Sequence, residues 1–209
     1  MLAVSEAGED AVKHERLWAG VALALFAGVS VYLTYHAQRL EKSLEERETK
    51  KVSALRGQPA PDFTLPALAN APGGAERVAL ADYRGQVVFV SFWASWCRPC
   101  DYELPLLNQF YVNHRDRNVQ VIAISVDDDR AAAVAYFEKR KFDLPMVWDE
   151  GGRVADLYKA EALPMLVVID PEGRVREVER GVRMDLESWL DRQVRAHSPK
   201  KPAADKKAS

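Results

Sequence analysis

The fold is decided by one stretch of the chain, VVFVSFWASWCRPCDYELP, at residues 87–105. Its first part, Val87–Phe92, is an apolar run of β-branched and aromatic residues that predicts a buried strand. Two cysteines separated by two residues follow, and a helix is predicted from about Cys97 to His114. A Cys-x-x-Cys pair that opens a helix directly after a buried strand indicates thiol–disulfide chemistry.

The spacing of the two cysteines allows their sulfurs to form a disulfide, or to separate as thiols, with little backbone movement. Cys97 at the helix start faces unpaired backbone N–H groups and the positive end of the helix dipole, which lower the pKa of a thiol. Arg98 adds positive charge there, and Pro99 is tolerated in a first turn. Cys97 is therefore the predicted nucleophile, and Cys100 the resolving cysteine.

The bulk composition excludes several classes of protein. Two cysteines are too few for a small disulfide-stapled scaffold. No histidine lies at zinc-ligand spacing from the pair, so no metal site is predicted, and the redox-active cysteine pair needs no further cofactor. The four histidines are His14, His36, His114 and His197. With 29 basic and 31 acidic residues, the chain has no overall field for a nucleic-acid partner.

Strands and helices alternate beyond the cysteine pair. Further strands are predicted at Val119–Val126, Met165–Ile169 and Val175–Val178, and helices at Arg130–Lys141 and after a cap at Asp185. The turn at residues 170–173 has proline second and glycine fourth, as a type I turn prefers. The pattern predicts an α/β fold with a mixed central sheet flanked by helices, whose final hairpin forms an antiparallel edge.

Other residues near the pair have two interpretations each. The acidic run Asp127–Asp129 can supply metal ligands or a solvated helix start, and we favour the second. Trp93 and Trp96 bracket the cysteine pair. Trp96 is predicted to border a docking surface, whereas Trp93 can equally be an ordinary core residue or part of the site.

An uncharged apolar run, Leu17–Tyr35, is long enough for a helix to cross a bilayer. Trp18 lies at one end, and Tyr32 and Tyr35 at the other, as expected for interfacial anchors. A buried core helix normally has one polar face, which this run lacks. A cleaved signal peptide has a shorter apolar run and a small-residue cleavage site. The run therefore predicts an uncleaved transmembrane helix.

The central stretch resembles the active-site segment of thioredoxins, and most closely that of the TlpA/ResA-like extracytoplasmic thiol–disulfide oxidoreductases. PAPDFTLP (59–66) and LADYRGQ (80–86) are similar to the family's amino-terminal strands and its lead into the first core strand. ALPMLVVIDPEGRV (162–175) is similar to its cis-proline strand and the hairpin that follows. The similarity implies a thioredoxin-like fold and covers about residues 57–196. The expected organisation is an amino-terminal segment 1–16, a transmembrane anchor 17–35, a polar stalk 36–56, a thioredoxin-like domain 57–197 and a disordered basic tail 198–209.

The resemblance also implies roles for single residues. Pro164 matches the family's cis-proline facing the cysteines, and the backbone of Leu163 is expected to pair with an extended substrate. Trp96, Arg98 and Pro99 are the other expected substrate contacts. Pro105 is expected to kink the helix.

Glu103 matches a family glutamate close to the cysteines. Its spacing places it on one helix face with Cys100, so it can exchange a proton with that thiol; a solvated surface acid is the alternative. Cytoplasmic thioredoxins carry a buried acid where this chain has Ser91. We therefore expect Glu103 to handle the proton.

The implied activity is reduction of protein disulfides outside the cytoplasm, for example in cytochrome c or copper-site maturation, with electrons from a membrane thiol carrier. Two alternatives remain open. The PAPDFTLP opening also occurs in peroxiredoxins, but their threonine is replaced by Ala94. A copper-binding chaperone of the same fold would need a late histidine, and His197 is the only one.

The expected membrane orientation rests on two conflicting arguments. Basic residues are more frequent after the apolar run than before it, which favours a cytoplasmic carboxyl side. The resemblance places the domain outside, and the basic-residue rule weakens for long translocated segments. We expect a single-pass protein of the cytoplasmic (inner) membrane with an extracytoplasmic, periplasmic domain.

Overall fold

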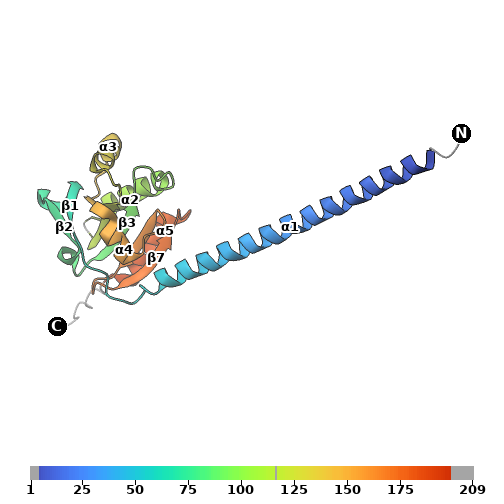
Figure 1. Cartoon of the computed structure of the whole chain (residues 1–209). Helices are drawn as coiled ribbons and strands as arrows, with labels where there is room; N and C mark the ends of the chain where they lie inside the picture. The colour runs from blue at the N-terminus through green and yellow to red at the C-terminus, as the bar shows by residue number, and fades with distance from the viewer. Residues whose placement is uncertain (1–4, 116, 199–209) are drawn as a thin grey trace, which may run out of the picture. The chain divides into compact units, whose positions relative to one another are not determined.

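The computed structural model describes residues 5–115 and 117–198, and the chain divides into two units, Met1–Lys50 and Lys51–Ser209 (Figure 1). Residues 1–4 of the predicted amino-terminal segment and residues 199–209 of the predicted tail lie outside the described residues. The positions of the two units relative to one another are not determined, so each is considered by itself.

The amino-terminal part of the chain is one continuous helix, α1 (Ser5–Ser53). It includes the whole apolar run 17–35 and most of the predicted polar stalk, with no break at the change from apolar to charged sequence. Within the residues available to such a search, no helix combines the length and the apolar character needed to span a membrane.

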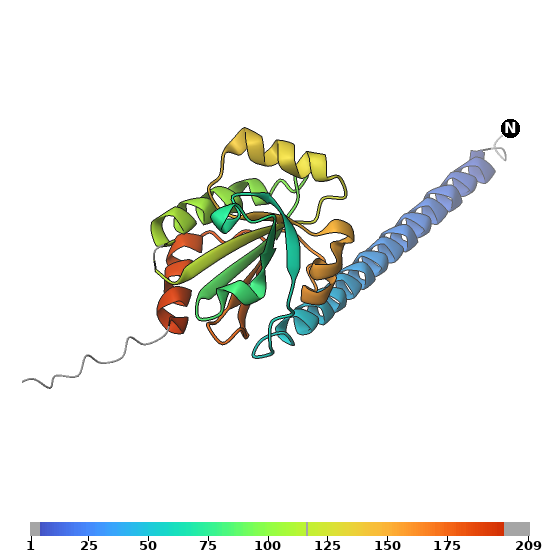
Figure 2. The same cartoon turned by 90° about the vertical axis from the view of Figure 1, so that its left-hand side faces the viewer.

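The second unit is built on a seven-stranded sheet in the order β2-β1-β5-β4-β3-β6-β7 (Figure 2). The strands are β1 (Thr64–Ala69), β2 (Arg77–Ala79), β3 (Val87–Trp93), β4 (Val119–Ser125), β5 (Met146–Trp148), β6 (Met165–Ile169) and β7 (Val175–Arg180). The strand β3 pairs in parallel with β4 and antiparallel with β6, and all of its residues are buried. The sheet is therefore mixed and ends in the antiparallel β6–β7 hairpin, as predicted.

Helices cover both faces of this sheet. They are α2 (Cys100–His114), α3 (Arg130–Arg140), α4 (Arg153–Tyr158) and α5 (Leu186–His197). Successive side chains of a strand point to opposite faces. Phe89 and Trp93 of β3 thus join a core with residues of α2, α3 and α5, whereas Phe92 joins a second core with Tyr158 of α4.

The helix that carries the cysteines begins at Cys100, three residues later than predicted. The residues before it form tight turns, in which the Cys97 N–H donates to the Ala94 carbonyl and the Cys100 N–H to the Cys97 carbonyl. These turns redirect the chain from β3 into α2. Cys97 therefore lies just before the helix, with Pro99 at the cap position.

One prediction about the other helices needs correction, and two short elements were not predicted. Asp185 stands at the cap position of α5, but its side chain makes no capping bond. Its carboxylate instead contacts Arg183 at 2.7 Å and Arg192 at 2.8 Å, because two guanidinium groups compete for it. The elements β5 and α4 were not predicted, since three and six residues are too short to show a periodicity.

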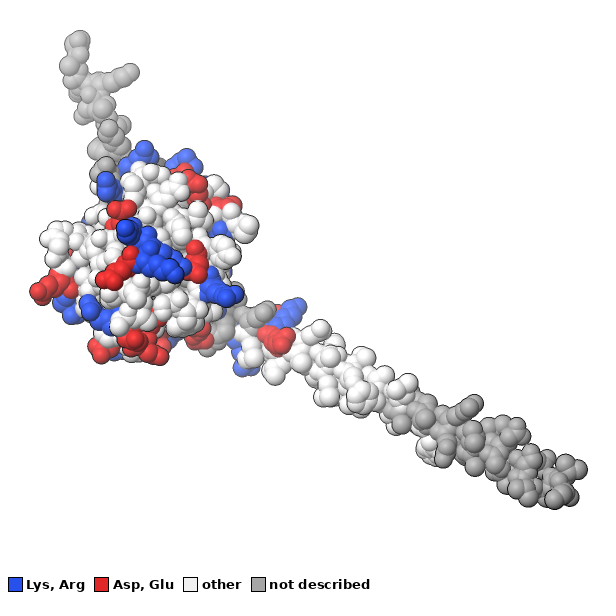
Figure 3. Space-filling model, turned by 90° about the horizontal axis from the view of Figure 1, so that it is seen from above, with Lys and Arg blue, Asp and Glu red and all other residues white. Residues whose placement is uncertain are grey.

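The surface of the second unit carries both signs of charge. On the face in Figure 3, basic and acidic side chains are interspersed. Several are paired, as Arg56 is with Glu177 at 2.8 Å. Exposed pairs of this kind contribute about 0–1 kcal/mol each, so the apolar core rather than surface pairing stabilises the unit.

The packing of α2 yields a stability prediction. Leu104 is on the buried face of α2 and is completely buried, whereas Leu106 on the same helix is 38% exposed. Leu104→Ala should lower the free energy of unfolding by about 2–5 kcal/mol, because it removes buried methyl groups and leaves a cavity. Leu106→Ala is the matched control and should cost less than half as much. Equal losses in denaturant titrations would contradict this assignment of the buried face.

Candidate active site

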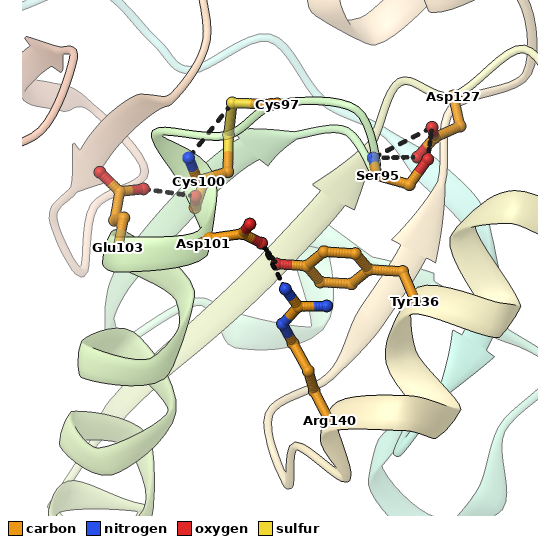
Figure 4. The surroundings of a disulfide bond; sticks show 9 residues. Ser95, Cys97, Cys100, Asp101, Glu103, Asp127, Tyr136 and Arg140 are labelled. Carbon is orange, nitrogen blue, oxygen red and sulfur yellow. Dashed lines mark hydrogen bonds and ion pairs between the residues drawn. A yellow bond between two sulfur atoms is a disulfide. The ribbon is translucent and has the colours of Figure 1, made fainter.

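The two cysteines form a disulfide at the junction of β3 and α2 (Figure 4). Their sulfurs are 2.03 Å apart and their Cα atoms 5.4 Å apart. Cys97 is 4% exposed and Cys100 is completely buried. A partner can therefore approach Cys97 more readily, in keeping with its prediction as the nucleophile.

The amino end of α2 points at the sulfur of Cys97. The backbone N–H of Cys100 donates to Cys97 Sγ over 3.3 Å. Once the disulfide is reduced, such an N–H and the positive end of the helix dipole stabilise a thiolate at Cys97. The arrangement favours negative charge on the outer sulfur rather than on the buried one.

Glu103 is buried on the first turn of α2, with 2% exposure. The hydroxyl of Ser91 on β3 donates to its Oε1 over 2.8 Å. The alternative of a solvated surface acid is therefore wrong. Burial raises the pKa of Glu103 to about 7, against the smaller opposing effect of the Ser91 hydrogen bond. A carboxyl group that titrates near neutral pH is suited to both accepting and donating a proton.

The peptide bond between Leu163 and Pro164 is cis, as the resemblance implied. Pro164 directly precedes β6, which pairs with β3, and its carbonyl accepts from the Gly181 N–H over 2.8 Å. Leu163 packs against the core cluster that contains both cysteines. Within residues 5–115 and 117–198, its backbone makes no hydrogen bond to another backbone group.

The other residues predicted to contact a substrate are exposed to solvent and adjoin Cys97 in the sequence. Trp96 is 69% exposed, and Arg98 and Pro99 are exposed beside it. Trp93, in contrast, is completely buried, with its ring centroid 4.8 Å from that of Tyr136. Trp93 therefore belongs to the core, and Trp96 to the exposed surface beside the disulfide.

The acidic run after β4 is not uniformly solvated, contrary to expectation. Asp129 does cap α3, where its carboxylate accepts from the Ala131 N–H over 2.9 Å. Asp127 is buried, and its carboxylate accepts from the N–H and hydroxyl of Ser95 (Figure 4). It also accepts from the hydroxyl of Ser125. Among the residues that the structure describes, no group of three metal-ligating side chains occurs.

A second group near the cysteines was also missed. Asp101, next to Cys100, accepts hydrogen bonds from the Tyr136 hydroxyl over 2.8 Å and from Arg140 over 2.6 Å. The Arg140 guanidinium lies 3.8 Å from the centre of the Tyr136 ring. These contacts tie α3 to the first turn of α2, and no sequence pattern joins residues so far apart.

Two observations bear on the alternative functions. Ala94, where peroxiredoxins carry threonine, is completely buried and supplies only its carbonyl to Cys97. His197 ends α5 among Arg176 and Asp170, and Asp170 follows the carboxyl end of β6. Pro164 precedes the opposite end of that strand, so His197 and the cysteines lie at opposite ends of β6.

Comparison with known proteins places this geometry in a family. The sequence model of the AhpC/TSA family matches residues 56–178. The thiol-disulfide oxidoreductase ResA of Geobacillus kaustophilus is 32% identical over 145 residues, which cover 68% of this chain and 80% of that relative. Its counterpart in Bacillus subtilis is 31% identical over 131 residues, which cover 63% of this chain and 70% of that relative.

The chain belongs to the TlpA/ResA-like thiol–disulfide oxidoreductases within the AhpC/TSA family. A solved structure from Chlorobium tepidum, a candidate thiol:disulfide interchange protein DsbE, superposes with a TM-score of 0.63 at 30% identity. The superposed region covers 69% of this ResA-like chain and 98% of the Chlorobium tepidum chain. The thioredoxin domain of a Bacteroides vulgatus thiol-disulfide oxidoreductase superposes with a TM-score of 0.57 at 26% identity. The superposed region covers 66% of this chain and 96% of that domain.

The raised pKa of Glu103 predicts a pH-dependent stability. An acid with a pKa of 4.5 unfolded and about 7 folded binds more protons in the folded state between these values, so its contribution to stability falls as pH rises through that window. Glu103→Gln removes this loss. The free energy of unfolding of the oxidised variant should therefore gain about 3 kcal/mol on the wild type between pH 4 and pH 8.

Glu138→Gln on the exposed face of α3 is the matched control and should track the wild type across this range. Denaturant titrations at several pH values measure both differences. A constant difference between Glu103→Gln and the wild type would show that folding does not shift the pKa of Glu103.

Proposed function

We propose that this protein is a membrane-anchored reductase of protein disulfides outside the cytoplasm. The observation that carries the exchange chemistry is the position of Cys97 Sγ, 3.3 Å from the backbone N–H of Cys100 at the amino end of α2. The nearby buried Glu103 supports it, because a thiol pair that alternates between two states needs a proton acceptor that also titrates near neutral pH.

The reaction is dithiol–disulfide exchange. The Cys97 thiolate attacks one sulfur of a substrate disulfide, so a mixed disulfide forms and the other substrate sulfur leaves as a thiolate. The Cys100 thiolate then attacks Cys97 Sγ and displaces the second substrate sulfur. Two electrons pass to the substrate, which becomes a dithiol, and Cys97 and Cys100 end as a disulfide.

Glu103 serves the second step. Cys100 is completely buried, so water has little access to its thiol. Glu103 lies one helical turn further on the same face, and its carboxylate takes the proton that Cys100 loses before attack. When the protein is reduced again, the same carboxyl group returns a proton to Cys100.

The substrate is expected to bind across the exposed surface beside Cys97. Trp96 and Pro99 offer apolar contact, Arg98 a positive charge, and the backbone of Leu163 offers hydrogen bonds to an extended segment. The relatives are named for thiol–disulfide exchange, and we extend this to apocytochrome c or copper-site assembly proteins as the targets. A thiol carrier in the membrane would return the protein to its reduced state.

The anchoring part of the proposal rests on the sequence. Residues 17–35 are uncharged and apolar, and they lie inside the continuous helix α1. We propose that they cross the inner membrane once, with the thioredoxin-like domain on the periplasmic side. A covalent tether to the membrane would keep the cysteine pair near a membrane-embedded electron donor.

Trapping of a mixed disulfide tests the exchange reaction. In Cys100→Ser, the adduct on Cys97 cannot be resolved, so cells that express this variant should accumulate adducts that vanish on reduction. The matched variant Cys97→Ser should trap few. Non-reducing gels give the comparison. The roles of the two cysteines are reversed if Cys97→Ser is the variant that traps partners.

Labelling from outside the cell tests the orientation. After mild reduction, a membrane-impermeant maleimide applied to intact or spheroplasted cells should label Cys97, because the domain is proposed to lie outside the cytoplasm. The chain has no thiol other than Cys97 and Cys100, so any label on it reports this pair. The double variant Cys97→Ser/Cys100→Ser is the blank. Labelling that requires lysis would place the domain inside and exclude extracytoplasmic substrates.

A further inference from the structure

A buried carboxylate lies beneath the turn that carries the nucleophile. Asp127 is 3% exposed, and the Ser95 N–H lies 3.0 Å from Oδ1 and 2.9 Å from Oδ2. The Ser95 hydroxyl donates to Oδ1 over 2.6 Å, and the Ser125 hydroxyl to Oδ2 over 2.8 Å. Hydrogen bonds to a charged acceptor are among the stronger ones in proteins.

The backbone of Asp127 is fixed by two strands of the sheet. Its N–H donates to the Ser125 hydroxyl at the end of β4, over 3.2 Å. Its carbonyl accepts from the Trp148 indole N–H at the end of β5, over 2.8 Å. Asp127 therefore cannot shift without disturbing the ends of both strands, and it offers a rigid support to whatever it binds.

What Asp127 binds is the segment that positions Cys97. Ser95 lies two residues before Cys97, and the N–H of Cys97 donates to the carbonyl of Ala94 over 3.1 Å. The turn is thus held at Ser95 on one side and by α2, through Cys100, on the other (Figure 4). Between these two supports, Cys97 Sγ meets the N–H of Cys100.

We propose that Asp127 is a positioning residue, whose carboxylate holds Ser95 and thereby keeps Cys97 Sγ at the amino end of α2. The inference rests on the proposed role of Cys97 as the nucleophile. Without this support, residues 94–97 gain freedom, and the sulfur spends less time within reach of the Cys100 N–H. The thiolate at Cys97 then loses part of its stabilisation.

The two possible effects of Asp127 on Cys97 have opposite signs. As a nearby negative charge, the carboxylate disfavours a thiolate, so its removal would lower the pKa of Cys97. As a support for the turn, it favours the thiolate, so its removal would raise that pKa. The direction of the change therefore separates positioning from simple electrostatics, and a purely structural role would change stability alone.

The test is the pH dependence of Cys97 alkylation in the reduced full-length protein. Iodoacetamide rates are measured in a Cys100→Ser background, in which Cys97 is the only thiol. Asp127→Asn should raise the apparent pKa of Cys97 by about half to one unit, so alkylation below that pKa slows about threefold to tenfold. Asp128→Asn, at the exposed neighbouring position, is the control and should leave the profile unchanged.

An unchanged or lowered pKa of Cys97 in folded Asp127→Asn overturns the proposal. If that variant does not fold, Ser95→Ala decides by the same criterion, since it keeps the carboxylate and removes one donor; a slowing of about twofold is expected there. An ordinary thiol pKa in the parent protein would instead count against Cys97 as the activated nucleophile. The failure of this inference is therefore distinguishable from failure of the proposed function.

Discussion

The passage from β3 into α2 is the constraint on which the rest of the structure depends. The strand β3 pairs with a neighbour on each side and is buried along its whole length, so its end is fixed in space. Only residues 94–99 separate it from α2, and their consecutive turns place Cys97 before the first helical N–H groups. Both cysteines are buried there, Cys100 completely and Cys97 with 4% exposure.

Two buried carboxylates near the disulfide differ in how their burial is compensated. The carboxylate of Asp127 receives hydrogen bonds from both Ser95 and Ser125, and it holds a turn in place. Glu103 receives one, from Ser91, and the uncompensated cost of burial raises its pKa to about 7. The number of donors around each group suits the first to a fixed structural contact and the second to proton transfer.

The surface around Cys97 is built from segments that the sheet brings together. The strand β6 lies beside β3 in antiparallel orientation, so Pro164 at its start comes next to the carboxyl end of β3. Trp96 and Arg98 come from the turn itself. The pairing of β3 with β6 therefore brings the turn that carries Cys97 next to the segment that carries the cis-proline.

Elements whose signal lies in neighbouring residues could be predicted from the amino-acid sequence. A mixed α/β sheet and a redox-active cysteine pair were predicted from three local features: the run Val87–Phe92, the Cys-x-x-Cys spacing and the hairpin turn at residues 170–173. This was possible because periodicity and turn chemistry are properties of neighbouring residues. The cis peptide bond before Pro164 was predicted only because residues 162–175 resemble a known family. Short elements such as β5 and α4 gave no such signal.

The environment of each buried acid could not be predicted from the sequence and follows from the fold. Glu103 and Asp127 both looked compatible with a solvated position, since burial depends on what other segments pack over a residue. Ser91 faces Glu103 across twelve residues of sequence, and Ser95 faces Asp127 across thirty-two. Such contacts follow from the pairing of strands and the packing of α2 on the sheet. Desolvation and hydrogen bonding, which set the chemistry of both groups, are therefore fixed by the fold rather than by the local sequence.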